Sequence, residues 1–177
     1  MPAQSFVEAL HEQIANEFGA EQQYIACAVY YESQTLPQLA NLFYKQAIEE
    51  RNHAMMMLGF LLDRGGEMRV PGVAQPVNNF KDFIEPIALA LEQEKSVTAQ
   101  IEALFRAART EGDVLGEQFM LWFLKEQVEE VAAMNTLLTI AQRAGEDWFQ
   151  IEDHLAREAV GDGGNDASAP AAAGGTL

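Results

Sequence analysis

Apolar residues recur every three or four positions along most of the chain, which is the spacing that places them on one face of an α-helix. Proline and glycine interrupt this pattern. Pro37 follows the first apolar stretch, Gly65 ends the second, and Gly112 and Gly145 follow the next two. Pro86 makes the start of the third helix hard to place. The pattern predicts helices over about 5–33, 37–64, 81–110, 114–143 and 147–159.

Four of the predicted helices are long, about 28 residues each, and at 1.5 Å per residue each spans about 42 Å. The first two and the last two of these are joined by short links, so each pair is expected to form an antiparallel hairpin. The link between the pairs is long enough to travel the length of a bundle. The chain is therefore predicted to be all-α, an up-down-down-up four-helix bundle followed by a short fifth helix. We expect this domain to span 1–160, with a disordered tail rich in Gly and Ala over 161–177.

Composition narrows the classes of partner. The chain carries 27 acidic and 11 basic residues and a net charge of −16, which disfavours nucleic acid and acidic membrane surfaces as partners. Its apolar runs fall short of the roughly 20 residues that a membrane span needs. The first residues lack a basic start and an apolar stretch, so we expect a cytoplasmic protein. Cys27 is the single cysteine, excludes an internal disulfide, and is expected to be a small buried residue.

Carboxylates interrupt the apolar face of all four long helices near mid-length. In the third helix, the spacing that aligns Leu91 and Ile101 places Glu94 between them on the same face. The corresponding acids of the other helices are Glu17, Glu50 and Glu130. A buried carboxylate is unfavourable unless something neutralises it, and these faces contain no Lys or Arg. A bound pair of cations is the simplest compensation.

Glu50 and His53 form the sharpest local motif, because residues three apart lie on one helix face and can bind one metal. Carboxylates with one imidazole favour iron or manganese over a thiolate-bound zinc. Glu21 is expected at the edge of the apolar face. Tyr24 lies two turns after Glu17. Two interpretations of this residue remain open, an ordinary core aromatic and a neighbour of the metals.

Several segments together resemble the ferritin family over nearly the whole chain, most closely the non-haem bacterial ferritins of actinobacteria. They are Asn16-Glu17, Tyr24, residues 47–54, Gln93-Glu94, residues 116–119 and residues 126–130. The resemblance implies a ferritin-like bundle that oxidises Fe(II) with dioxygen and stores Fe(III) as a hydrous oxide inside a hollow cage of 24 identical subunits.

The resemblance also implies roles for individual residues. One iron would be held by Glu17, Glu50 and His53, and the second by Glu50, Glu94 and Glu130. A third iron site would use Glu49, Glu126 and Glu129, while Tyr24 and Gln127 would lie next to the iron pair.

Departures from related families narrow the choice. Gln127 and Glu130 stand where bacterioferritins and many di-iron oxygenases carry a second Glu-x-x-His, and Asn52 stands where haem-binding bacterioferritins carry a methionine. No haem is therefore expected. The full ligand set within one chain argues against mini-ferritins, which bind metal between subunits. Two alternatives remain: a di-iron enzyme of the oxygenase or rubrerythrin class, and a non-catalytic helical interaction module.

Overall fold

The structure, a computed structural model, describes residues 4–65, 68–158 and 166–177. Within these ranges the chain forms five helices, which are α1 (Gln4–Ser33), α2 (Pro37–Asp63), α3 (Glu85–Thr110), α4 (Val114–Ala144) and α5 (Trp148–Arg157). Three of them, α1, α2 and α4, begin and end within one residue of the boundaries predicted from the sequence. The fifth helix was predicted to reach residue 159, but α5 ends at Arg157 because the backbone of Glu158 is extended; residue 159 itself lies outside the described residues.

The start of α3 is the clear correction, because it lies at Glu85 rather than at residue 81. Pro86 has no amide hydrogen and therefore suits the first turn of a helix better than its interior. The side chain of Asp82 closes the helix start: its Oδ1 accepts from the backbone amides of Ile84 at 3.0 Å and Glu85 at 2.9 Å. Such a carboxylate satisfies amides that have no partner within the helix.

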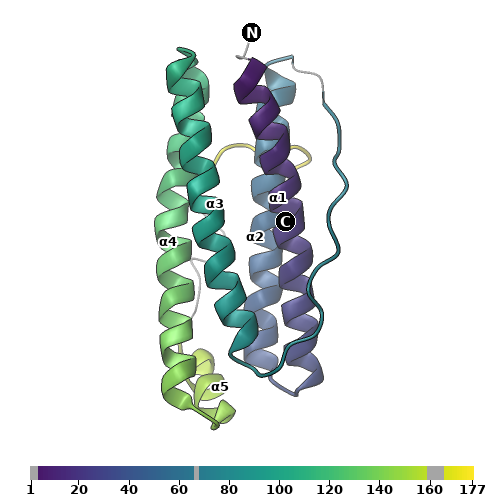
Figure 1. The fold of residues 1–177 in the computed structure, drawn as a ribbon, viewed down its shortest axis with the longest axis vertical. Helices are drawn as coiled ribbons and strands as arrows, with labels where there is room; N and C mark the ends of the chain where they lie inside the picture. The colour runs from purple at the N-terminus through teal and green to yellow at the C-terminus, as the bar shows by residue number, and fades with distance from the viewer. Residues whose placement is uncertain (1–3, 66–67, 159–165) are drawn as a thin grey trace.

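The bundle has the predicted connectivity. α1 and α2 form one antiparallel hairpin and α3 and α4 the other, and the link between them returns along the length of the bundle beside α1 (Figure 1). Gln23 of α1 holds this link through both ends of its amide, with Nε2 donating to Val77 O at 2.9 Å and Oε1 accepting from Val77 N at 2.8 Å. Because the link returns along the whole bundle, α2 and α3 run in the same direction.

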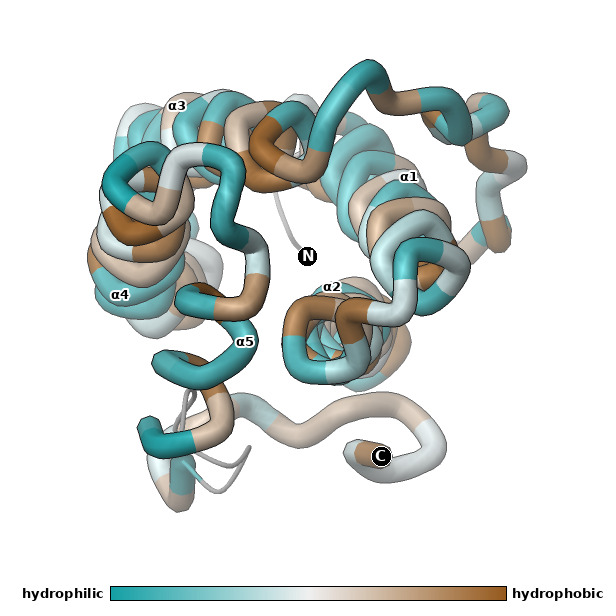
Figure 2. The backbone as a smooth tube through the Cα atoms, turned by 90° about the horizontal axis from the view of Figure 1, so that it is seen from below, coloured by the Kyte–Doolittle hydropathy of each residue, from teal (hydrophilic) through white to brown (hydrophobic). Residues whose placement is uncertain are grey.

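The short helix α5 closes one end of the bundle against α2 and α4 (Figure 2). The carboxylate of Glu152 accepts from the backbone amides of Gln38 at 2.8 Å and Leu39 at 2.9 Å, which are first-turn amides of α2. None of the helices in the described ranges has the length and apolar character needed to cross a membrane.

The apolar core is divided into two parts by a layer of buried polar side chains. One part surrounds Tyr31 and Phe43 near α5, and the other surrounds Leu10 and Ile101 near the opposite end. Each long helix places buried polar residues between these two parts: Glu17 on α1, Glu50 and His53 on α2, Glu94 on α3, and Gln127 and Glu130 on α4. The predicted acids in the apolar faces thus lie inside the bundle at one level.

Candidate metal centre

Four helices contribute to the polar layer, and each places its side chains there through the same heptad spacing that builds the core. Glu17, Glu50 and Glu94 are at most 1% exposed, and His53 is 4% exposed. Glu130 is buried at 8% exposure. All five residues predicted as ligands of the iron pair are therefore buried. Glu21 is only partly buried, as its predicted place at the edge implies.

Glu17, Glu50 and His53 form the tightest group. Each offers one ligand atom, and these atoms all lie within 4.8 Å of one another. His53 Nδ1 is 3.5 Å from Glu50 Oε2 and 3.9 Å from Glu17 Oε2, which is too long for hydrogen bonds but leaves room for a cation between the atoms. Burial lowers the pKa of His53, so its imidazole is neutral near pH 7 and able to bind a metal.

The carboxyl groups of this layer destabilise one another's charged forms. Burial raises the pKa of Glu50 well above its usual range, and the charges of Glu94 and Glu17 raise it further. Burial also raises the pKa of Glu94 to about 7 and that of Glu130 well above its usual range. Without a cation the layer therefore holds protons at neutral pH, and a divalent metal that binds there must displace them.

Three carboxylate oxygens in the layer are left without a hydrogen-bond partner among the described residues: Glu17 Oε2, Glu50 Oε2 and Glu94 Oε2. Buried polar atoms are nearly always paired, because an unpaired one loses its interaction with water and gains nothing in return. Three such oxygens at one level, beside a neutral imidazole, fit a site built for hard cations. The donor set matches the chemistry of iron or manganese.

Neutral donors hold the other side of this layer. The hydroxyl of Tyr24 donates a hydrogen bond to Glu94 Oε1, so the residue faces the acids as well as packing against Phe43. Gln127 Oε1 accepts from the hydroxyl of Thr98 at 2.9 Å. Gln13 donates from Nε2 to Glu17 Oε1 at 2.8 Å and is itself only 2% exposed. The sequence pattern alone marks neither Gln13 nor Thr98 as functional, although each lies one turn from a buried acid.

The three acids predicted as a third iron site are only partly brought together. Glu49 and Glu126 line one cavity with His53, and their charges contribute to the raised pKa of Glu130. The side chain of Glu129 is 57% exposed, and its Oε1 lies 3.7 Å from Lys125 Nζ. Glu129 therefore faces solvent in this structure.

This cavity has a volume of about 550 Å³ and lies between α2, α4 and the C-terminal residues 166–177. Three hydrogen bonds fix that segment. Trp122 Nε1 donates to Asp166 Oδ2 at 3.0 Å, Ala173 N donates to Met55 O at 2.9 Å, and Leu177 N donates to Asn52 Oδ1 at 3.2 Å. The predicted boundary near residue 160 lies outside the described residues, so the domain division stays a prediction.

Similarity to known proteins identifies the family. A family model described as a ferritin-like domain matches residues 7–144. Ferritin BfrB of Mycolicibacterium smegmatis is 57% identical over 172 residues, which are 97% of this chain and 94% of that protein. The chain belongs to the ferritin family. Ferritin BfrB of Mycobacterium tuberculosis is 53% identical to this ferritin over 176 residues, 99% of this chain and 97% of that protein. An open pore ferritin from the archaeon Archaeoglobus fulgidus superposes with a TM-score of 0.85 at 29% identity, covering 89% of this chain and 99% of that one.

This ferritin is therefore an iron-storage subunit with ferroxidase activity, and it acts in a multimeric cage. The predictions of fold, family and reaction are confirmed. The oxygenase or rubrerythrin alternative and the interaction-module alternative are set aside, because the family match covers the whole bundle.

Proposed function

We propose that the polar layer of Glu17, Glu50, His53, Glu94 and Glu130 is the ferroxidase centre of this ferritin. One Fe(II) ion binds Glu17, Glu50 and His53, and the other binds Glu50, Glu94 and Glu130. The observation that carries the proposal is the set of three buried carboxylate oxygens that lack a partner among the described side chains, next to a neutral imidazole. A cation supplies each of these oxygens with the interaction it lacks.

The charges of the layer suit two Fe(II) ions. Four ionised carboxylates carry four negative charges, which balance the four positive charges of the two ions. Each ion then gives one electron to the same O₂ molecule, which takes up two protons and leaves as hydrogen peroxide. The resulting Fe(III) ions exceed the charge of the ligands, so they bind hydroxide from water, release protons and move on to the mineral.

The residues around the acids prepare the centre for this chemistry. The Tyr24 hydroxyl donates to Oε1 of Glu94, and Oε2 of the same carboxylate has no hydrogen-bond partner among the described residues. Gln127 is held by Thr98 beside the same acid. Because both side chains are neutral, they orient the ligand without competing with the metal for charge. We place Tyr24 and Gln127 next to the iron pair as orienting groups.

Glu49, Glu126 and Glu129 are proposed as the third iron site, on the route between the pair and the face covered by residues 166–177. Glu49 and Glu126 already line the cavity that reaches His53. Glu129 joins them through a change of rotamer that releases its contact with Lys125.

We further propose a cage of 24 subunits in the cytoplasm, without haem. Asn52 supports the absence of haem, because its side chain accepts from Leu177 N rather than offering a thioether ligand. With 24 chains of 19.6 kDa, the expected particle has a mass of about 470 kDa. A sizing column of the purified protein tests the number of subunits, and the absorbance of the haem Soret band tests the absence of haem.

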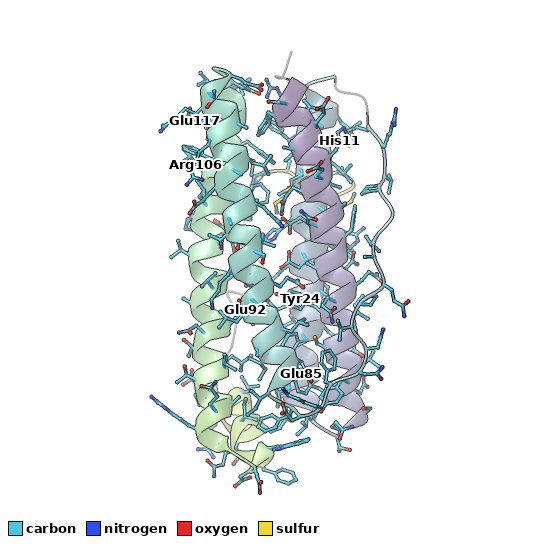
Figure 3. The ribbon with its side chains drawn as sticks, viewed as in Figure 1. His11, Tyr24, Glu85, Glu92, Arg106 and Glu117 are labelled. Carbon is cyan, nitrogen blue, oxygen red and sulfur yellow. The ribbon has the colours of Figure 1, made fainter. Side chains whose placement is uncertain are left out.

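The ferroxidase assignment is tested by Glu94→Ala and Glu130→Ala. Fe(II) is added under argon, air is admitted, and the initial rise of Fe(III) absorbance is recorded. We expect the rate to fall roughly tenfold or more in both variants, because each removes a ligand. Glu92→Ala is the matched control, since Glu92 lies on the same helix with its side chain 73% exposed on the outer face (Figure 3). Unchanged rates in intact cages of both ligand variants contradict the assignment.

A further inference from the structure

Gln13 is a buried glutamine on α1, one turn before Glu17. It has no role in the ferroxidase chemistry proposed above. Its Nε2 donates to Glu17 Oε1 at 2.8 Å, and the residue is 2% exposed. The second oxygen of the same carboxylate, Glu17 Oε2, has no hydrogen-bond partner within the described part of the chain and lies 3.9 Å from His53 Nδ1. The two oxygens of Glu17 therefore have different surroundings: one is held by an amide and the other faces the imidazole.

The orientation of the Gln13 amide is fixed by a second hydrogen bond. Gln13 Oε1 accepts from Asn16 Nδ2 at 3.3 Å, and the same Asn16 nitrogen donates to Gln100 Oε1 of α3 at 3.2 Å. Because the Asn16 amide donates to both glutamine oxygens, the nitrogen of Gln13 is left to face Glu17. A short chain of amides thus runs from α3 to a single oxygen of a metal-facing carboxylate.

We propose that Gln13 is a positioning residue of the ferroxidase centre, which holds Glu17 Oε1 so that Glu17 binds metal through Oε2 alone. This inference rests on the proposed function of the centre. With Oε1 held toward the Gln13 amide, Glu17 presents Oε2 to the metal, so it takes one coordination position and leaves the others open. Orienting donors of this kind tune a metal site through its ligands.

The proposal predicts how the site changes when the donor is lost. Gln13→Leu keeps a similar volume and removes the hydrogen bond, so the Glu17 carboxylate can rotate and bind through both oxygens. Gln13→Glu keeps the shape and places a second acceptor against Glu17 Oε1. Asn16→Ala leaves the Gln13 amide in place but free to reverse, so its effect has the same direction and is smaller.

The test is anaerobic titration of the metal-free cage with Co²⁺, which does not turn over with O₂ as Fe(II) does and whose visible bands report coordination number. We expect affinity at the Glu17 position to fall about tenfold or more in Gln13→Leu and Gln13→Glu. The visible bands should also weaken in Gln13→Leu, because a second carboxylate oxygen raises the coordination number. Gln22→Leu makes the same change at an exposed position of α1 and should leave both readouts unchanged.

Two further measurements separate the possible failures. Glu17→Ala must abolish the Co²⁺ signal of that position, and if it does not, the site assignment itself is wrong. If Glu17→Ala removes the signal while Gln13→Leu and Gln13→Glu match the wild-type affinity and spectrum, the positioning role is wrong and the assignment stands. Thermal unfolding of each variant is measured in parallel, since a purely structural role of Gln13 lowers the melting temperature and leaves the cobalt spectrum unchanged, which also overturns the proposal.

Discussion

Removing the charge of Glu94 is expected to stabilise the metal-free protein. The folded protein raises the pKa of Glu94 from its usual 4.5 to about 7, with burial as the main cause. The difference between these values, at 1.4 kcal/mol for each pKa unit, corresponds to roughly 3–4 kcal/mol. At pH 8.5, Glu94→Gln should therefore raise the stability of the metal-free fold by about that amount, because the amide keeps the shape without the charge.

The pH dependence has a definite sign. A carboxyl whose pKa is raised on folding makes its full contribution to stability at low pH, where it is protonated. This contribution is lost as the pH rises through about 7, because the folded protein must then bury the ionised form. Glu50 and Glu130 act in the same direction, since burial raises the pKa of both. The metal-free parent should thus become less stable between pH 5 and 8.5. The advantage of Glu94→Gln should be small at pH 5 and largest at pH 8.5.

The assay is urea unfolding of metal-free cages at fixed protein concentration, followed by circular dichroism at both pH values. Glu92→Gln is the control, because it removes a charge from an exposed position of the same helix. With Co²⁺ added, the parent should become more stable than Glu94→Gln, because the parent binds the ion more tightly and gains more stability from it. A parent as stable as Glu94→Gln at pH 8.5, or a difference that does not change with pH, would refute the reasoning.

Other parts of the fold make separate predictions. Burial raises the pKa of Cys27 to about 12, so its thiol should not react with Ellman's reagent at pH 8 in the folded cage and should react once per chain in urea; reaction at the rate of a free thiol contradicts this. A Cβ at Gly59 would lie 3.1 Å from Ala171 O, so Gly59→Val should detach residues 166–177 and expose them to limited proteolysis, measured by mass spectrometry. Gly19→Ala, with no neighbour within 4 Å among the described residues, should leave that digestion unchanged and stabilise α1 by roughly 0.5–1 kcal/mol. Glu152→Gln weakens the acceptor for two α2 amides and should lower stability by about 1 kcal/mol in thermal unfolding; an unchanged melting temperature means that this contact contributes nothing.

The sequence predicted the bundle and its acids because both follow from one repeated spacing. Apolar residues at every third or fourth position define which face of each helix is buried, and Glu94 occupies that face by the same count that places Leu91 and Ile101 there. The i,i+3 spacing of Glu50 and His53 was also sufficient to predict that they act together, because two residues so spaced on one helix project to the same side. These features need only helix geometry.

Features that depend on side-chain rotamers or on contacts between helices were not predictable in this way. Helix periodicity could not show that the hydroxyl of Thr98 reaches Gln127 on another helix. It could not show that Asn16 and Gln100 meet across two helices, and so it missed Gln13. It also could not show that Glu129 lies exposed beside Lys125. The start of α3 depended on a local hydrogen bond that the Asp82 carboxylate accepts from the Glu85 amide.

The polar layer that divides the core also has a consequence for folding. A bundle held only by leucine-like contacts has alternative alignments, in which one helix slides along its neighbours by a heptad, about 10 Å, and still buries apolar surface. Here such a slide would place Glu94 or Glu130 against an apolar cluster, without its polar neighbours. We therefore expect misaligned bundles to be disfavoured while the chain folds, before any metal is bound. The acids that reduce the stability of the metal-free protein thus select one alignment of the four helices.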